Sequence, residues 1–459
     1  MLTFDRELID KYNIAGPRYT SYPPATFFHD GFKNEDLLKS VEISNQQKPE
    51  NVSVYVHIPF CPQLCTFCGC TTYTGMGNNV IERYIDALVK EIELVSKYIS
   101  KDRPLTQIHW GGGTPNAIEP EFISRVTEVI KANFNLADHY EMAMECSPAY
   151  LEYDMVDHLA DLGFNRLSLG IQDFNQKVLT AINRRPAIIP VDEMISYLRK
   201  KDFKGINLDL VYGLPFQTKE SFTETVQKAI EANPDRLVTF SYAHIPSVLP
   251  KQKLLEQYGL PSPQDKMTML EIAFNLTKEA GYVPVGMDHF ARPDDEFVIA
   301  MNEKKLHRNF QGYCTRLTTG QVYAFGTSSI TQLHGAYAQN EKTIHKYIDR
   351  IENEGLAVVR GYQLKKEEQI IRHVINELMC NYYADFNKIA AEYDSTVGEV
   401  YNATGNNMEA LEPFINDDLV EISNNQVTVK GQGRYVIRNI AMAFDPAIKQ
   451  GIGLYSKTV

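Results

Sequence analysis

Short runs of β-branched and aromatic residues alternate with helix-like patterns through the first half of the chain. Residues 53–58, Ser-Val-Tyr-Val-His-Ile, alternate and are rich in side chains that favour strands. Residues 81–95 instead place apolar side chains three and four positions apart, which is typical of a helix packed on a sheet. Repeated strand–helix units predict a parallel sheet with right-handed crossovers. We expect strands at 52–57, 107–110, 140–146, 166–171, 206–211 and 236–242, and helices at 81–95, 120–130, 155–162, 191–199 and 219–232.

The two ends of the chain follow other patterns. Residues 10–24 are rich in Tyr and Pro, which is typical of a segment that lies over another part of the protein rather than of a core helix. Helical patterns at 367–390, 408–416 and 433–444 accompany two short strands at 419–429 that meet at an Asn-Asn turn. Such an order of elements occurs in DNA-binding winged modules, but the acidic balance of the chain favours a lid or support domain.

These patterns divide the chain into three predicted parts. We expect an N-terminal arm at 1–45, a strand–helix domain at 46–360 and a mostly helical C-terminal domain with a small hairpin at 361–459. A chain of 459 residues that is 44% hydrophobic is long and apolar enough for two or three domains with a substantial core. Periodicity leaves open whether the sheet is an open one or a partial barrel.

Charge, the N-terminus and the cysteine content disfavour several classes of protein. The formal net charge of −12 disfavours nucleic-acid binding, which depends on a basic surface. The N-terminus is charged and lacks the apolar core of a signal peptide, and no apolar run reaches the roughly 18 residues of a membrane span. Seven cysteines, an odd number, indicate a reducing compartment. We therefore expect a cytoplasmic protein without a membrane span, and we expect a monomer.

Four cysteines lie within ten residues, and the first three have the spacing C-x3-C-x2-C. Cys61, Cys65 and Cys68 follow a predicted strand that ends at two prolines, so they fall on the loop at its carboxyl end. Three thiolates on one loop can hold three irons of a 4Fe–4S cluster and leave the fourth iron open for a small molecule. Cys70 comes two residues later, and a cluster already held by three thiolates does not require it.

Other uses of these cysteines are less favoured. A zinc-stabilised binding module is one alternative, but zinc usually takes two compact ligand pairs, and no second pair follows here. A disulfide framework belongs to small secreted chains. Buried inert thiols suit the scattered Cys146, Cys314 and Cys380 but not a cluster beside two prolines.

A second predicted strand runs into three glycines. The segment 107–115, Gln-Ile-His-Trp-Gly-Gly-Gly-Thr-Pro, places them at the strand's carboxyl end. Glycines let a backbone approach a ligand closely and offer bare N–H groups to a carboxylate. A glycine triplet alone could be only a tight turn. Next to an iron–sulfur candidate on the preceding strand end, it indicates a binding site.

Together these motifs resemble those of a known superfamily. A C-x3-C-x2-C loop with an aromatic residue before its last cysteine, followed by a Gly-Gly-Gly-Thr-Pro strand end, resembles the radical S-adenosylmethionine enzymes. From about residue 10 to about residue 450, the chain is also similar to one family among them, the oxygen-independent coproporphyrinogen III oxidases. The runs that carry this likeness are Gly16-Pro-Arg-Tyr-Thr-Ser-Tyr-Pro23, Tyr55-Val-His-Ile-Pro-Phe-Cys61, Cys68-Gly-Cys70, His109-Trp-Gly-Gly-Gly-Thr-Pro115, Gly163-Phe-Asn-Arg-Leu-Ser168, Gly286-Met-Asp-His-Phe-Ala-Arg-Pro-Asp-Asp295 and Leu306-His-Arg-Asn-Phe-Gln-Gly-Tyr313.

The resemblance implies a fold and a set of cofactors. It implies an α/β fold of the radical S-adenosylmethionine type, a curved six-unit partial (β/α) barrel left open at one side for a large substrate. It implies that Cys61, Cys65 and Cys68 bind a 4Fe–4S cluster, and that two S-adenosylmethionine molecules bind nearby. The residues that would contact S-adenosylmethionine are Tyr55, Phe67, Gly112, Gly113, Thr114, Glu145, Gln172, Arg184, Asp209, Ala243 and Ile330.

Only some of these residues carry a signal of their own. Glu145 follows an apolar strand and is a poor core residue, so a functional role is favoured. Asp209 lies in an apolar run, where a buried carboxylate needs a partner. Without the resemblance, Gln172 and Arg184 read equally well as ordinary loop residues.

The resemblance also implies a radical reaction on a tetrapyrrole. Removing hydrogen from an unactivated propionate carbon needs a radical that side chains do not supply, so a cofactor must. In the family, a reduced cluster splits S-adenosylmethionine, and the 5′-deoxyadenosyl radical takes a hydrogen from the propionate β-carbon. Loss of CO2 and one further electron turns two propionates of coproporphyrinogen III into vinyl groups and gives protoporphyrinogen IX. We expect an electron donor such as flavodoxin or ferredoxin, and also an electron acceptor, whose identity the sequence does not indicate. No side chain is assigned as a general acid or base.

Such a substrate needs a basic pocket in an acidic protein. Four propionates are strongly anionic, so the pocket must be locally positive. Candidate partners in the family-like runs are Arg18, Arg292, His307 and Arg308, although each reads equally well as a surface salt-bridge residue. The planar fork of arginine matches a carboxylate, which favours Arg over Lys there.

Departures from the family pattern bear on the substrate more than on the cofactors. Thr71 and Thr72 stand where an Asn is usual, Cys146 and Ser147 stand where Val and Asp are usual, and Cys314 replaces a hydroxyl residue. Two related alternatives therefore stay open, a radical enzyme that opens heme and a heme-trafficking protein. The trafficking branch typically lacks the Cys-Gly-Cys and His-Arg-Asn-Phe-Gln-Gly-Tyr runs that are present here.

Overall fold

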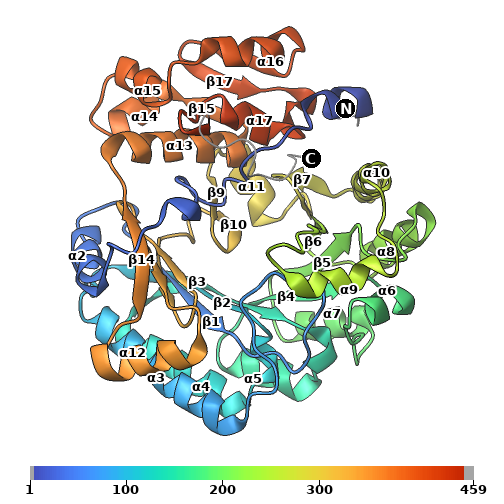
Figure 1. Ribbon diagram of the computed structural model, residues 1–459, viewed down its shortest axis with the longest axis vertical. Helices are drawn as coiled ribbons and strands as arrows, with labels where there is room; N and C mark the ends of the chain where they lie inside the picture. Colours follow the sequence, from blue (N-terminus) through green and yellow to red (C-terminus); the bar gives the residue numbers. More distant parts are fainter. Residues whose placement is uncertain (1–4, 449–459) are drawn as a thin grey trace.

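A twelve-stranded sheet forms the centre of the computed structural model, which describes residues 5–448 (Figure 1). Its strand order is β14-β13-β12-β11-β1-β2-β3-β4-β5-β6-β8-β7. Strands β1 to β6 are parallel neighbours in chain order, and β11 lies parallel to β1 on its other side. The parallel strands are β1 (Val52–Ile58), β2 (Pro104–Gly112), β3 (Asn135–Cys146), β4 (Arg166–Gln172), β5 (Ile206–Tyr212), β6 (Arg236–Ser241) and β11 (Gln321–Phe325).

Helices cover the outside of these strands, as the apolar spacing predicts (Figure 1). Helix α3 (Asn78–Ser96) buries Tyr84, Leu88 and Ile92, four residues apart, in the main core. The alternation of strands and helices confirms the predicted α/β fold with a parallel sheet. The other covering helices are α4 (Pro120–Asn133), α5 (Tyr153–Asp161), α6 (Gln176–Ala181), α7 (Val191–Lys200), α8 (Lys219–Glu231) and α12 (Ile344–Glu354).

Antiparallel strands that the sequence pattern did not predict extend the sheet at both edges. On one side β12 (Ile330–Gln332), β13 (Ala336–Asn340) and β14 (Val358–Gln363) follow β11. On the other side β8 (His289–Ala291) and β7 (Val283–Val285) follow β6. The edge strands β14 and β7 do not pair with each other, so the curved sheet stays open.

The segments that flank the sheet add smaller elements. These elements are α2 (Asn34–Ser44), α9 (Lys253–Glu256), α10 (Pro263–Glu279), α11 (Glu296–Asn302) and the two-stranded pair β9 (Leu306–Asn309) and β10 (Gly312–Thr315). Within residues 5–448, no helix has both the length and the apolar character needed to cross a bilayer.

The N-terminal segment begins with a short helix and continues as an extended arm beside the C-terminal helices (Figure 1). In α1 (Arg6–Tyr12), the Tyr12 ring stacks on Phe414 with centroids 4.6 Å apart. Farther along, Arg438 donates two hydrogen bonds, of 2.9 and 2.6 Å, to backbone carbonyls of the arm. Beyond the last turn of α1, residues 10–24 therefore lie over other parts of the protein, as the sequence predicts.

The C-terminal part contains the predicted hairpin but not the predicted long helix. Strands β16 (Val420–Ser423) and β17 (Gln426–Val429) turn at two asparagines with left-handed backbone, φ 53° and 61°. The single helix expected at 367–390 is wrong, because the chain turns at Tyr382 (φ 54°) and the next residues pair with β17. The elements of this part are α13 (Lys366–Asn381), β15 (Tyr383–Asp385), α14 (Phe386–Glu392), α15 (Val397–Ala403), α16 (Glu412–Asn416) and α17 (Ile437–Met442).

A buried carboxylate joins helix α3 to the antiparallel edge of the sheet. Glu91 is 2% exposed. It accepts hydrogen bonds from the Gly326 N–H (2.9 Å), the Asn340 amide (2.6 Å) and the Tyr347 hydroxyl (2.6 Å). Burial raises the pKa of Glu91 to about 7, and the three donors offset this rise only in part. The folded protein therefore holds a proton on Glu91 at pH values where the unfolded chain has lost it.

We expect Glu91→Gln to remove one contribution to the pH dependence of stability. The contribution of Glu91 to the free energy of unfolding of the wild type falls as pH rises from about 4.5 to about 7, because only the folded state keeps this proton. The glutamine variant has no such proton. Over this range its free energy of unfolding should therefore rise relative to that of the wild type by on the order of 2–3 kcal/mol. Melting temperatures measured by circular dichroism across this range report the difference. A difference between variant and wild type that stays constant with pH would contradict the assignment.

Candidate active site

The loop after β1 carries the clustered cysteines and is closed by backbone hydrogen bonds. The Cys61 N–H donates to the Tyr73 carbonyl (2.9 Å), and the Tyr73 N–H donates back to the start of the loop (2.7 Å). Cys61, Cys65 and Cys68 are half-buried, and Cys70 is exposed. The three thiols of the C-x3-C-x2-C motif therefore lie at the carboxyl end of β1, where the sequence predicts them.

Each of the three sulfurs accepts a hydrogen bond. The donors are Thr114 Oγ1 to Cys61 (3.4 Å), Arg184 Nη1 to Cys65 (3.6 Å) and the Cys70 N–H to Cys68 (3.4 Å). Burial raises the pKa of Cys61 and Cys65, while hydrogen bonding from Cys70 lowers the pKa of Cys68 to about 6. Sulfurs that accept such hydrogen bonds suit the thiolates of an iron–sulfur cluster.

A zinc ion and a cubane cluster place different demands on the cysteines. Among residues 5–448, no three His, Cys, Asp or Glu side chains are placed to hold one metal ion together. A structural zinc site needs four ligands around one ion. A cubane cluster does not need such convergence, because each thiolate binds a different iron.

The glycine run at the end of β2 serves close packing more than it offers free N–H groups. The Gly113 N–H donates to the Ile58 carbonyl (2.7 Å), and the Thr114 N–H donates to the Phe60 carbonyl (2.9 Å). The expectation that these N–H groups are bare is therefore wrong. A Cβ at Gly113 would lie 2.6 Å from the Phe60 oxygen, so glycine lets β2 lie against the start of the cysteine loop.

Glu145 lies near the end of β3, beside the glycine run. Its carboxylate accepts a hydrogen bond from the Gly112 N–H (3.3 Å) and is hydrogen-bonded to His109 Nε2 (3.2 Å). The His109 ring in turn stacks on Tyr55, with ring centroids 6.0 Å apart. Burial raises the pKa of Glu145, but His109 and Gly112 lower it more, so the carboxylate is ionised at neutral pH. The side chain is nevertheless 43% exposed, because it faces a cavity.

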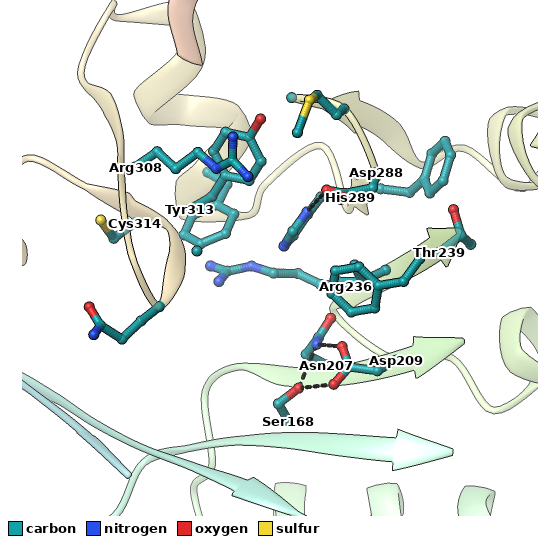
Figure 2. A pocket seen from close by; sticks show the side chains of 18 of the residues that line it. Ser168, Asn207, Asp209, Arg236, Thr239, Asp288, His289, Arg308, Tyr313 and Cys314 are labelled. Atoms are coloured by element: carbon teal, nitrogen blue, oxygen red, sulfur yellow. Dashed lines mark hydrogen bonds and ion pairs between the residues drawn. The ribbon is translucent and has the colours of Figure 1, made fainter. Parts of the chain in front are cut away.

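Asp209 lies on β5 within a small hydrogen-bonded group (Figure 2). Ser168 Oγ donates to one carboxylate oxygen (2.8 Å), and Asn207 Nδ2 donates to the other (2.7 Å). Burial raises the pKa of Asp209 to about 6, and the two donors limit the rise. The buried carboxylate therefore has the partners that its apolar sequence surroundings require.

Gln172 and Arg184 lie close together at the cysteine loop. Gln172 ends β4 with a left-handed backbone, φ 69°. Both side chains pack against Gly170. A Cβ added to this glycine would lie 2.8 Å from the Gln172 amide nitrogen and 2.9 Å from the Arg184 guanidinium. Arg184 also donates to the Gly170 carbonyl and to the Cys65 sulfur. The fold thus gives these two residues a place that their local sequence did not indicate.

A cavity of about 550 Å³ lies inside the curve of the parallel strands. Of the predicted cofactor contacts, Glu145, Asp209 and Ala243 line it. Phe67 packs instead in a small apolar cluster with residues of α6 and α9, and Ile330 packs in another with Phe28 and Tyr337. Of the others, Thr114 and Arg184 contact cysteine sulfurs, and Gly112 contacts Glu145 of the cavity lining. One cavity therefore adjoins the predicted cofactor region.

Cations from distant parts of the chain converge on the same cavity. Its lining includes Arg18 of the arm, Lys266 of α10, Arg308 of β9, Arg434 and Arg438. Arg308 Nη1 donates to the Arg18 carbonyl (3.0 Å) and lies across the cavity from Asp209 (Figure 2). Burial and the charges of Arg18 and Arg308 lower the pKa of Arg438 to about 10. This part of the cavity therefore has a positive field that an anion would stabilise.

Two of the four cations predicted from the sequence are not part of this lining. Arg292 instead donates to two backbone carbonyls, at 3.0 and 2.9 Å, in the turn before β6. His307 is neutral, because burial and the nearby charge of Arg316 lower its pKa to about 3. The prediction is wrong for these two residues. Lys266 and Arg434 carried no signal in the sequence, because only the tertiary fold brings them to the cavity.

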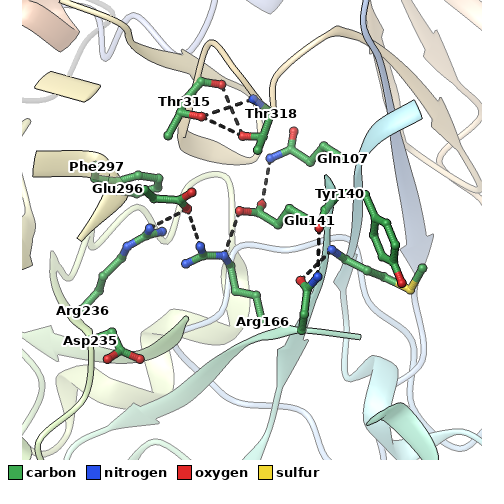
Figure 3. Close-up of polar contacts among 12 residues, drawn as sticks. Gln107, Tyr140, Glu141, Arg166, Asp235, Arg236, Glu296, Phe297, Thr315 and Thr318 are labelled. Carbon is green, nitrogen blue, oxygen red and sulfur yellow. Dashed lines mark hydrogen bonds and ion pairs between the residues drawn. The ribbon is translucent and has the colours of Figure 1, made fainter. Parts of the chain in front are cut away.

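An ion network lines one end of the cavity (Figure 3). Arg166 contacts Glu141 (2.8 Å) and Glu296, and Arg236 contacts Glu296 (2.8 Å) and Asp295 (2.9 Å). The network ties α11 to strands β3, β4 and β6. Loss of one partner would leave a buried charge uncompensated, which is strongly destabilising. This network was not predicted from the sequence, because its only local signal is a charged residue at the first position of two strands.

Comparisons with known proteins agree with this geometry. A family model described as the Radical SAM superfamily matches residues 55–229. The chain is 40% identical over 450 residues to the oxygen-independent coproporphyrinogen III oxidase of Salmonella typhimurium, covering 98% of this chain and 96% of that protein. The protein of the same name from Escherichia coli is 39% identical, with coverage of 98% and 96%, and that from Synechocystis is 38% identical, with 96% and 95%.

A solved structure shows the same likeness in three dimensions. Coproporphyrinogen III oxidase from Escherichia coli, described as a radical SAM enzyme, matches with a TM-score of 0.89 at 38% identity, over 97% of this chain and 99% of that chain. The cysteine loop, the parallel sheet and the full-length likeness lead to one assignment. The chain belongs to the oxygen-independent coproporphyrinogen III oxidase family of the radical S-adenosylmethionine superfamily.

Proposed function

We propose that this protein converts coproporphyrinogen III to protoporphyrinogen IX without oxygen, as a step of heme biosynthesis. Two propionate side chains are oxidatively decarboxylated to vinyl groups. One observation carries the proposal: in a chain of this family, a single cavity is lined by Glu145 and Asp209 near the cysteine loop and by cations across from them. A tetrapyrrole with four carboxylates needs both a large cavity and positive charge.

Family membership implies a 4Fe–4S cluster and S-adenosylmethionine, and the residues present fit both groups. Cys61, Cys65 and Cys68 would bind the cluster, and each sulfur already accepts a hydrogen bond. When bound, the two groups supply the radical that takes a hydrogen atom from the substrate. The chain's own residues hold these groups next to the cavity and keep water away from the reacting carbon.

We further propose that two S-adenosylmethionine molecules contact this site. The ionised Glu145 suits a cationic amino or sulfonium group, and Asp209 gives the cavity a second carboxylate. Arg184, beside the Cys65 sulfur, suits a carboxylate next to the cluster. The remaining proposed contacts are Tyr55, Phe67, Gly112, Gly113, Thr114, Gln172, Ala243 and Ile330.

The proposed substrate is held by its propionates at the positive side of the cavity. Arg18, Lys266, Arg308, Arg434 and Arg438 would bind carboxylates there, and the planar guanidinium groups offer two parallel hydrogen bonds each. This binding leaves another propionate to face Glu145 and the cofactors. Each reacting propionate gives up one hydrogen atom from its β-carbon, one CO2 and one electron, and a vinyl group remains.

The reaction requires partners for its electrons. We propose a small electron carrier such as a flavodoxin or a ferredoxin as the donor and leave the electron acceptor unnamed. We also propose that the protein works as a cytoplasmic monomer. The acidic net charge of −12 and the odd number of seven cysteines are in keeping with this setting.

Anaerobic incubation with coproporphyrinogen III, a reductant and S-adenosylmethionine tests the proposed function. We expect formation of 5′-deoxyadenosine together with the stepwise loss of two carboxyl groups, measured by mass spectrometry. Cleavage of S-adenosylmethionine without decarboxylation would contradict the substrate while leaving the enzyme class in place. Parallel incubation with heme tests the alternative of a heme-opening enzyme, for which we expect no linear tetrapyrrole.

A further inference from the structure

An exposed apolar segment follows β6. Ile245, Val248, Leu254 and Tyr258 are four of the fourteen large apolar side chains exposed in the described part of the chain, and all four lie between 245 and 258. Val248 is 70% exposed and Leu254 is 55% exposed. Apolar side chains gathered in one exposed place are typical of an interaction surface. Residues 245–258 are called the docking segment below.

The docking segment lies against the cysteine loop. The Leu249 side chain is 3.6 Å from the place where a Cβ would stand on Gly69, one residue after Cys68. Gln252, which is 1% exposed, donates to the carbonyl of Phe67 (3.1 Å) inside the same loop. The segment that carries the exposed apolar side chains therefore packs, through Leu249 and Gln252, against the loop with the predicted cluster ligands.

Basic side chains border the docking segment. Lys251 and Lys253 belong to it, and its one acidic residue, Glu256, is hydrogen-bonded to His244 (3.0 Å). Arg185 donates to the Gln63 side chain of the cysteine loop (3.0 Å). At the far end of the segment, Tyr258 contacts the Phe216 ring, and Lys177 lies over that ring, 4.1 Å from its centroid. An acidic protein thus carries a local basic and apolar surface over the cysteine loop.

We propose that the docking segment, with Lys177 and Arg185, binds an acidic one-electron carrier protein that reduces the cluster; this inference rests on the proposed function. One electron passes from the reduced flavin or iron–sulfur centre of the carrier to the oxidised cluster, and no bond forms or breaks. Because the chain has a net charge of −12, it repels acidic proteins as a whole. A local basic surface is therefore needed to steer such a partner to the loop. Complexes between electron carriers and their partners are typically short-lived and have small interfaces.

The double variant Lys251→Glu/Lys253→Glu tests the surface, with flavodoxin as the probe. We expect the Kd for oxidised flavodoxin at low ionic strength to rise about tenfold or more, and added salt to weaken binding to the wild type. With equal iron content in both proteins, the rate of cluster reduction by reduced flavodoxin, followed by absorbance, should fall about tenfold. Dithionite is a small anion that needs no docking, so its rate of cluster reduction should fall much less than the rate with flavodoxin. Lys253→Glu alone, at an exposed position, should give a smaller change in the same direction.

A matched control separates this surface from general charge effects. Lys97→Glu/Lys388→Glu makes the same charge change at exposed lysines after α3 and on α14, and its Kd should stay within about twofold of the wild type. An equal loss of binding in this control would overturn the proposal. So would an unchanged Kd in Lys251→Glu/Lys253→Glu, or failure of the wild type to bind flavodoxin at all. Failure to form product with dithionite while flavodoxin still binds would count against the proposed function and not against this surface.

Discussion

Cys65→Ala protein, reconstituted under anaerobic conditions, should hold almost no iron. In the proposed site each of the three thiolates binds a different iron, so loss of one leaves a corner of the cluster without a ligand. The loop is closed by its own backbone hydrogen bonds, between Cys61 and Tyr73 and from Tyr73 to the start of the loop. Cys70 is the nearest alternative, and it is already hydrogen-bonded to Cys68. Iron and acid-labile sulfide per chain measure this effect.

A cysteine outside the site serves as the control. Cys380 is fully buried in α13, and its loss removes one small apolar contact without touching the loop. Cys380→Ala should therefore keep the iron content and the visible spectrum of the wild type. Wild-type iron in the Cys65→Ala protein would contradict the assignment of Cys65 as a ligand.

Arg308→Ala should raise the KM for coproporphyrinogen III by about 10- to 100-fold, since a hydrogen bond to a charged group contributes about 1.5–3 kcal/mol. Arg308 lines the cavity and also holds the Arg18 carbonyl of the arm, so its loss weakens the positive side in two ways. The value of kcat should change little, because the reacting propionate lies elsewhere. Steady-state kinetics under anaerobic conditions give both constants.

Two further variants make this prediction specific. Arg292→Ala removes an arginine that also lies in a family-like run but does not itself line the cavity, and its KM should stay within about twofold of the wild type. Arg308→Lys keeps the charge but loses the planar fork, so its KM should lie between those of the wild type and Arg308→Ala. If Arg292→Ala and Arg308→Ala raised KM equally, the cavity would not be the place where propionates bind.

The parallel half of the fold could be predicted from the sequence because each strand and helix carries its own pattern. Strand β1 shows the two-residue alternation of a strand, and helix α3 shows apolar residues three and four positions apart. The structure places both elements within a few residues of the expected bounds. The antiparallel strands could not be predicted in the same way. Strands β7, β8 and β12 have three residues each, which is too short for a period, and they form only because a paired neighbour is present.

The site was predictable where its residues are neighbours in the sequence. The cysteine loop lies within one short segment, so spacing alone indicated its chemistry. Arg434 and Lys266 come from distant helices and turns, and nothing in their local sequence sets them apart from surface cations. His307 shows the opposite case, because it lies in a family-like run but packing buries it and lowers its pKa to about 3.

The most direct test of the central claim is the electron paramagnetic resonance spectrum of the reduced protein with and without S-adenosylmethionine. We expect about four irons per chain and a spectrum that changes when S-adenosylmethionine is added, because three thiolates leave one iron free to bind it. Protein that takes up zinc in place of iron, or iron whose spectrum does not respond to S-adenosylmethionine, would contradict a cluster with an open iron at Cys61, Cys65 and Cys68.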